Sequence, residues 1–193
     1  MSHHEGCYEG AMAYAAYCGH TELVDMLIKY GATDFNLALC EAAAGGHLHI
    51  IDKMIEHGAN DYDGAIENSI YEKRIDVLRK MLPHCSSIQA KLHLVGQYGD
   101  MNMLNIFLER GAKVNFLLFE YAIRSKNLDI VNYCLRFLKP TEECLTVAIL
   151  SKNMDLVLLL LEHGALVTQT VLFYANRCTE EVSAILREKK TKL

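Results

Sequence analysis

The sequence lacks tryptophan, holds only two prolines, and contains no pair of cysteines in Cys-x-x-Cys spacing. The scarcity of proline, together with abundant Ala, Leu and Ile, favours helices. Its seven cysteines are an odd, scattered set that suggests neither a disulfide framework nor the paired ligands of structural zinc. Several fall on helix faces that we expect to be buried. The composition therefore predicts a helical protein of a reducing, intracellular compartment.

Long apolar runs and a basic charge are also missing. The longest apolar run, from Leu156 to Leu161, is far too short to span a bilayer, and no secretory segment stands near the start. The formal net charge is -5 and the basic tail REKKTKL is brief, whereas phosphate binding needs a basic face. We expect a cytoplasmic protein that binds neither nucleic acid nor a membrane.

What the sequence does contain is a repeated pattern. It recurs in GHTELVDMLIKYGA, GHLHIIDKMIEHGA, GDMNMLNIFLERGA and KNMDLVLLLLEHGA, which close on Gly31, Gly58, Gly111 and Gly164. The gaps of 27, 53 and 53 residues fit a unit of about 26 to 27 residues if two members have lost their glycine. Those members are KRIDVLRKMLPHC and KNLDIVNYCLRFL, where Pro83 and Pro140 act as the chain-breakers.

Each unit is predicted to form two helices. In the second, apolar residues recur on one stripe and the closing glycine supplies a left-handed residue. The second helix is expected to start in the column His20, His47, Arg74, Asp100, Asn127, Asn153 and Thr179, most of whose side chains can accept a hydrogen bond from the first-turn amides. Residues that cap the first helix are Asp34, Asp61, Ser87, Asn115, Thr141 and Thr168. A column of mostly small residues, which lets neighbouring helices approach closely, is Ala15, Ala42, Ser69, Val95, Ala122, Ala148 and Ala175.

The pattern predicts one domain over residues 1–193. Its repeats are expected at 7–33, 34–60, 61–86, 87–114, 115–140, 141–167 and 168–188, with a short basic tail at 189–193. Because a helix pair can bury its apolar stripe only against its neighbours, the repeats should stack side by side as a solenoid.

The segments GHLHIIDKMIEHGA and NMDLVLLLLEHGA resemble the second helix of ankyrin repeats, and ALCEAAAGGH resembles the first helix with its double alanine. The resemblance covers residues 7–188 and is strongest in repeats one, two, four and six. An ankyrin repeat of about 33 residues carries a β-turn finger followed by Thr-Pro-Leu-His. Here that motif is missing, and connections such as ATD and AND are too short to hold a finger. The resemblance implies an all-α, right-handed solenoid of about seven stacked ankyrin-like repeats that lack β-hairpin fingers. Shortened repeats of this kind are similar to those of ankyrin-like proteins of large DNA viruses.

The sequence contains only weak indications of a metal site or a catalytic site. His47 and His49 are too close together at a helix start to chelate from one face, and no cysteine pair complements them or the MSHH segment. The Gly45-Gly46 pair lacks the context of a phosphate-binding loop. No paired carboxylates and no activated cysteine stand out. We expect no enzyme activity, no cofactor and no metal site.

The surface that stacking creates is the remaining functional signal. By analogy with ankyrin packing, the residue two positions after the small-residue column points into the concave groove, and a second column lies three residues earlier. Tyr and Arg on such columns are typical anchors of protein interfaces. The predicted partner-binding residues are Tyr14, Tyr17, Glu41, Asn68, Tyr71, Gln97, Tyr121, Arg124 and Arg177.

Two functions stay open at this point. The first is a protein-binding module whose partner lies on the concave helix face; if the protein is viral, the resemblance implies a host-directed adaptor or decoy in the host cytoplasm or nucleus. The second is a structural role, as a homo-oligomer or a minor virion protein, because the first and last repeats keep apolar segments such as AMAYAAY and TVLFYANRC. We expect a monomer or a weak homo-oligomer.

Overall fold

The computed structural model describes residues 5–178 and 180–190, and this part of the chain is entirely helical, with no strand. The all-α prediction is therefore confirmed. In chain order the α-helices are α1 Glu5–Cys18, α2 Thr21–Lys29, α3 Phe35–Gly45, α4 Leu48–Glu56, α5 Tyr62–Tyr71, α6 Ile75–Met81, α7 Ile88–Tyr98, α8 Met101–Glu109, α9 Phe116–Arg124, α10 Leu128–Cys134, α11 Glu142–Leu150, α12 Met154–Glu162, α13 Gln169–Cys178 and α14 Glu180–Lys190. A short 3-10 helix, Leu82–His84, follows α6 at Pro83.

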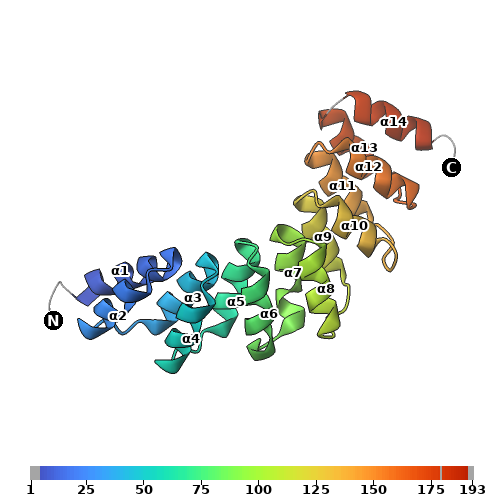
Figure 1. The fold of residues 1–193 in the computed structure, drawn as a ribbon. Helices are drawn as coiled ribbons and strands as arrows, with labels where there is room; N and C mark the ends of the chain where they lie inside the picture. The colour runs from blue at the N-terminus through green and yellow to red at the C-terminus, as the bar shows by residue number, and fades with distance from the viewer. Residues whose placement is uncertain (1–4, 179, 191–193) are drawn as a thin grey trace. The chain divides into compact units, whose positions relative to one another are not determined.

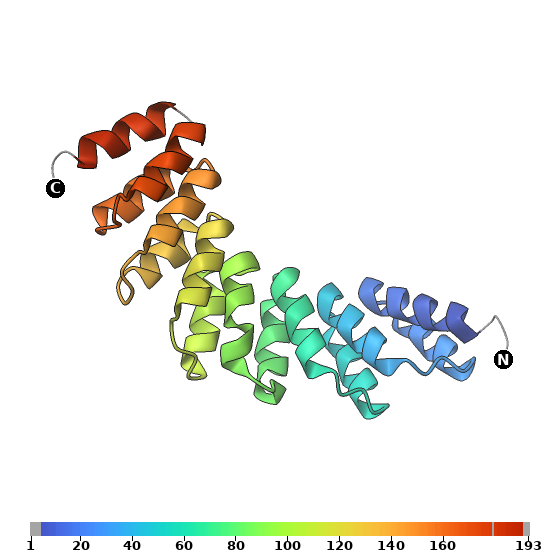
Figure 2. The same ribbon diagram turned by 180° about the vertical axis from the view of Figure 1, so that it is seen from behind.

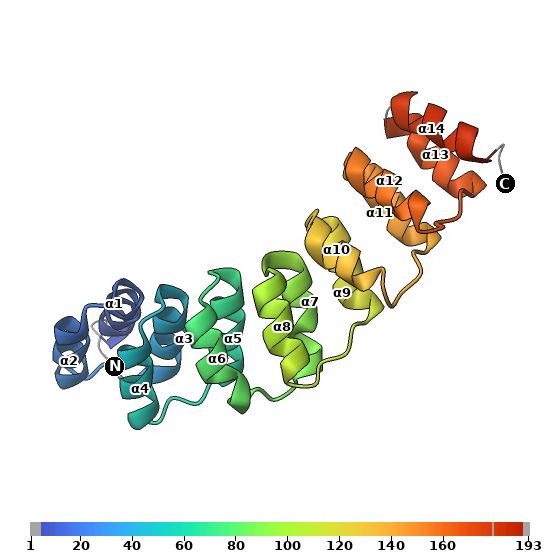
Figure 3. The ribbon, with the colours of Figure 1, turned by 45° about the vertical axis from the view of Figure 1, so that its right-hand side comes forward.

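The chain packs as two compact halves. The N-terminal half comprises Met1–Leu94 and Asn105–Ala112, and the C-terminal half comprises Val95–Leu104 and Lys113–Leu193, so the boundary passes through α7 and α8. In the N-terminal half, α1 packs on α3 and α3 on α5, and the second helices α2, α4 and α6 lie against them (Figure 1). In the C-terminal half, α11 packs between α9 and α13, and the pairing of each first helix with its second helix is clear in Figure 3.

The small-residue column lies in the core of both halves, as the sequence predicted. Ala15, Ala42, Ser69, Val95, Ala122, Ala148 and Ala175 are all buried. The hydroxyl group of Ser69, the polar member, donates a hydrogen bond of 2.7 Å to the carbonyl oxygen of Ile66. Burying a hydroxyl group is tolerated when it is bonded in this way. The larger apolar side chains of the second helices, such as Ile51 and Leu160, complete the core.

The first-helix caps are also confirmed. Each predicted residue accepts a hydrogen bond from the backbone amide three positions later, and the distances are 2.9 to 3.4 Å for Asp34, Asp61, Asn115 and Thr141. Ser87 and Thr168 make the same bond at 3.3 and 3.2 Å. Such caps satisfy one of the orphan amides of the first turn and typically contribute about 1 kcal/mol each.

The second-helix caps were predicted correctly in only part of the chain. Asp100, Asn127 and Asn153 cap their helices through side-chain oxygens. His20, His47 and Arg74 also stand at the N-cap position, as predicted, but none of them makes a side-chain cap, which corrects the expectation for the two histidines. Two of these longer side chains instead reach the preceding repeat, because His47 Nε2 donates to the Tyr17 carbonyl at 3.0 Å and Arg74 Nε donates to the Ala44 carbonyl at 2.8 Å. Thr179 lies outside the described residues.

His47 fits into a slot between two glycines. A Cβ atom on Gly19 would lie 2.5 Å from the imidazole Cε1, and a Cβ atom on Gly45 would lie 2.2 Å from the Tyr17 carbonyl oxygen and 2.6 Å from the imidazole Cδ2. The two repeats therefore approach so closely that neither glycine can carry a side chain without displacing its neighbours. The imidazole joins the first two repeats as a structural group.

A periodic polar clamp joins successive repeats of the N-terminal half on the side of the connecting segments. Glu9 accepts from the amides of Thr33 and Asp34 at 3.0 and 2.7 Å. One repeat later, Asn36 Oδ1 accepts from the amides of residues 60 and 61 at 2.7 and 3.0 Å. One repeat later again, Asp63 accepts from the Ser86 amide at 3.1 Å and from the Ser86 hydroxyl. The backbone that leads into each first-helix cap is thus held by a side chain of the preceding first helix.

The Asp63 clamp predicts a specific dependence of stability on pH. The hydrogen bonds from Ser86 lower the pKa of the Asp63 carboxyl from its usual 3.8. A group whose pKa is lowered by folding stabilises the fold above its unfolded-state pKa, and this contribution disappears as pH falls through the folded-state pKa. Asp63→Asn should therefore cost about 0.5–1 kcal/mol near neutral pH, and this cost should shrink as pH falls below the usual pKa of the carboxyl, 3.8. Urea unfolding of both proteins across this range measures the difference; a gap that does not change with pH would contradict the clamp.

Candidate binding surface on the first helices

In the N-terminal half, two of the first helices, α1 and α5, carry exposed tyrosines. Tyr14 and Tyr17 on α1 are 70% and 39% exposed, and Tyr71 at the end of α5 is 60% exposed. The interaction with the Cys18 thiol raises the pKa of the Tyr14 phenol, so this hydroxyl is protonated at neutral pH. Figure 2 shows these helices side by side from the side opposite to that of Figure 1.

The polar residues predicted between these tyrosines have different environments. Glu41 on α3 is half-buried. Asn68 on α5 is also half-buried, and its Nδ2 donates a hydrogen bond of 3.0 Å to the Cys40 carbonyl of α3. This bond gives Asn68 a role in joining the helices. Ala44, a member of the same column, is buried.

In the C-terminal half, the predicted residues are more charged. Gln97 and Tyr121 are half-buried, whereas Arg124 and Arg177 are exposed. Arg124 forms a fork with Glu120, one turn earlier on α9, through Nη2 at 2.7 Å and Nε at 3.1 Å. The guanidinium of Arg177 lies 5.4 Å from the ring centre of Phe173 on α13, within cation–π range.

A groove of about 380 Å³ crosses α9, α11 and α13 on this face. Its walls are formed by Glu120, Arg124, Glu142, Glu143, Thr146, Val147, Thr170 and Tyr174. A second hollow of about 270 Å³ adjoins it at Arg124 and Val147, and also contacts Leu150 and Ser151. Of the residues predicted as partner-binding, the structure brings only Arg124 into these hollows.

The carboxylates and threonines of the groove are not among the predicted residues. The two predicted columns run along the first helices, whereas the groove also takes residues one turn earlier, such as Glu143 and Thr170. Extending the same periodicity by one helical turn would have found them, because residues three and four apart share a helix face.

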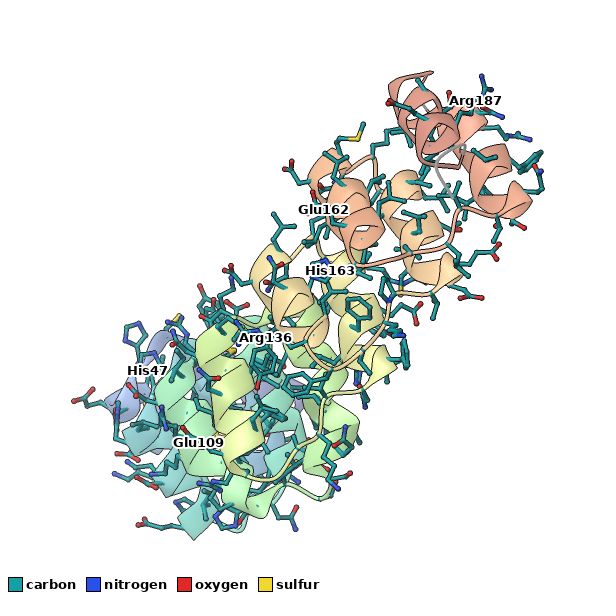
Figure 4. The ribbon with its side chains drawn as sticks, turned by 90° about the vertical axis from the view of Figure 1, so that its right-hand side faces the viewer. His47, Glu109, Arg136, Glu162, His163 and Arg187 are labelled. Carbon is teal, nitrogen blue, oxygen red and sulfur yellow. The ribbon has the colours of Figure 1, made fainter. Side chains whose placement is uncertain are left out.

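Four of the histidines make contacts within the fold. Figure 4 labels His47, whose contacts are given above, and His163 at the end of α12, which bonds through Nδ1 to the Leu159 carbonyl at 2.9 Å. The rings of His57 and His84 stack on Phe35 and Tyr62, each in its own repeat. Within the described part of the chain, no three His, Cys, Asp or Glu residues converge as metal ligands. The MSHH segment and the side chain of Cys7 lie outside what the structure describes.

Burial makes two of the thiols poor nucleophiles. Desolvation raises the pKa of Cys134 to about 12, and desolvation together with the nearby Asp61 raises the pKa of Cys40 to about 12. Desolvation also raises the pKa of Cys85. Since the thiolate is the reactive form, these cysteines are nearly inert at neutral pH.

Comparison with solved structures identifies the architecture. The human ASB11 ankyrin repeat domain superposes with a TM-score of 0.68, covering 92% of this chain and 96% of that domain at 19% sequence identity. The fold is that of an ankyrin repeat domain. Residues 112–180 also match a family model described as a domain of unknown function, DUF3447. No curated protein matches the sequence significantly.

Within residues 5–178 and 180–190, no helix combines the length and the apolar character that crossing a bilayer requires.

Proposed function

We propose that this chain is a non-enzymatic protein-binding module whose partner contacts the exposed face of the first helices. The observation that carries the proposal is the gathering of large side chains there: Tyr14, Tyr17 and Tyr71 are exposed on helices whose other faces are buried. Tyrosine offers a large amphipathic contact at low entropic cost, and arginine adds a charged anchor. A groove that holds mixed charges, as in the C-terminal half, also suits recognition of a polypeptide surface.

The similarity of the shortened, fingerless repeats to viral ankyrin-like proteins favours a host protein as the partner, met in the cytoplasm or nucleus. The side chains of Glu9, Asn36 and Asp63 bond the backbone of the connecting segments, the position where longer ankyrin repeats carry a finger.

The test is affinity capture with matched variants. Tyr17, Tyr71 and Arg124 are changed together to alanine, and the control protein carries alanine at Met26, Arg79 and Leu158, which are exposed on second helices. We expect the first variant to lose the captured partner and the control to keep it, since interface anchors typically contribute about 2 kcal/mol or more each. Circular dichroism checks that both variants are folded. Unchanged recovery with the folded first variant would defeat the assignment of this face.

A structural role is the second candidate, and exposed apolar side chains favour it. Phe116, Phe137 and Leu166 of the C-terminal half are 50%, 63% and 67% exposed. If they form a self-association surface, light scattering will show a mass that rises with concentration and returns to that of a monomer when the three residues become serine. A monomer at every concentration would remove this candidate.

A further inference from the structure

The groove across α9, α11 and α13 has walls rich in hydrogen-bond acceptors. Three carboxylates, from Glu120, Glu142 and Glu143, line it together with the hydroxyls of Thr146 and Thr170. The Thr146 hydroxyl donates to the Glu142 carbonyl at 2.9 Å, so towards any other group this oxygen can act only as an acceptor.

The charges of the groove do not cancel. Arg124 is its one cation, and its guanidinium is engaged by Glu120. Glu142 and Glu143, neighbours in the first turn of α11, therefore contribute negative charge without a cation in the groove lining to balance it. The hydrogen bond from Thr141 lowers the pKa of the Glu143 carboxyl, which is thus ionised at neutral pH.

An aromatic ring completes the lining. Tyr174 is half-buried on α13 and forms part of the groove wall. Cations are attracted to the faces of aromatic rings, and on the same helix Arg177 already lies over Phe173. Carboxylates, hydroxyl acceptors and an aromatic ring are together the groups that receive a guanidinium or an ammonium.

We propose that this groove binds an arginine or lysine side chain from a basic, extended segment of the partner protein. The proposal rests on the protein-binding function proposed above and specifies its chemistry in the C-terminal half. Charge complementarity selects a cationic occupant, and the volume of about 380 Å³ accommodates a long side chain. The adjoining hollow of about 270 Å³, with the exposed Leu150 at its wall, accommodates the next side chain of an extended segment.

The test uses a synthetic peptide, Gly-Ser-Gly-Arg-Arg-Leu-Gly-Ser-Gly, titrated into the full chain labelled with nitrogen-15. A matched peptide has glutamine in place of both arginines. We expect the arginine peptide alone to shift amide resonances, with the shifts concentrated on α11 and α13, and its affinity to fall with added salt. No shifts with the arginine peptide, or equal shifts with both peptides, would overturn the proposal.

A pair of protein variants separates the groove from general electrostatic attraction. Glu142→Gln with Glu143→Gln removes two charges from the groove, and Asp155→Asn with Glu162→Gln removes two exposed charges from α12 (Figure 4 labels Glu162). Affinity should fall roughly tenfold in the first variant and by less than about twofold in the second. Equal losses in both variants would mean non-specific attraction and would refute the groove.

The ring of Tyr174 provides an independent measure. Tyr174→Ala should weaken peptide binding by roughly threefold, whereas Tyr174→Phe should leave it unchanged, because the ring face and not the hydroxyl meets the cation. Equal losses in the two variants would contradict this contact. If the carboxylate variants bind the peptide normally while the Tyr17, Tyr71 and Arg124 variant still loses the captured partner, only the basic-segment proposal fails.

Discussion

Gly45→Ala is expected to lower the free energy of unfolding by about 2–3 kcal/mol, whereas Gly10→Ala is expected to raise it by about 0.5–1 kcal/mol. Gly45 ends α3 where a methyl group would lie 2.2 Å from the backbone carbonyl of Tyr17 and against the His47 ring. Backbone on α1 cannot yield as a flexible side chain can. A Cβ atom on Gly10, by contrast, would meet nothing within 4 Å, and alanine is the better helix former.

Urea denaturation of the two variants and the native chain measures both changes in the free energy of unfolding. Because the expected changes have opposite signs, a general effect of replacing glycine with alanine cannot produce both. If both variants are stabilised alike, the repeats do not approach each other as closely as the structure shows. If both are destabilised alike, the exposed position of Gly10 on α1 is wrong.

Phe119→Ala is expected to cost about 3–5 kcal/mol, the largest single loss that we predict. Phe119 lies at the centre of α9 and is fully buried, while Phe116, three residues earlier on the same helix, is 50% exposed. Removing the buried ring leaves a cavity in the C-terminal half, and residue 119 loses most of its side-chain packing contacts. Phe116→Ala should cost less than about 1 kcal/mol.

Thermal and chemical unfolding of the two phenylalanine variants provides the check. Because both variants replace phenylalanine with alanine on the same helix, the change in helix propensity is the same in both. The difference between their free energies of unfolding therefore reports the burial of the two side chains. Similar losses from both substitutions would contradict the orientation of α9, and with it the placement of Tyr121 and Arg124 on its exposed face.

The sequence predicted the fold well because its signals are local and repeated. A residue such as Asp34 or Asn115 caps its own helix three residues on, and the left-handed residues Gly31 and Gly164 close theirs, so each feature needs no information from the rest of the chain. The burial of Ala15, Ala42 and their equivalents could be predicted because these mostly small residues recur once in every repeat.

Features that depend on contacts between repeats could not be predicted in this way. His47 and Arg74 occupy cap positions in sequence, but their side chains are long enough to reach carbonyls of the preceding repeat instead. Lys73, Lys126 and Lys152 adopt positive φ at turns where repeats one and two have glycine. Lysine rarely adopts this backbone conformation, so the residue type does not predict it.

In the candidate site, too, local features could be predicted from the sequence, whereas features that depend on several helices could not. Exposure of Tyr14, Tyr17, Tyr71 and Arg124 on the first helices agrees with the periodicity, while their role in binding stays a prediction. The acidic groove was missed because it is assembled from three helices: α11 supplies four of its lining residues, and α9 and α13 supply two each. Such a site becomes visible only when the register of neighbouring helices is known.

Hydrogen–deuterium exchange of the chain, alone and with the protein recovered by capture, tests the central claim most directly. If the exposed face of the first helices binds the partner, added protection should appear in α1, α3 and α5 or in α9, α11 and α13, with little change in α2, α4, α10 and α12. Protection confined to those second helices, with the first helices exchanging as before, would contradict the account.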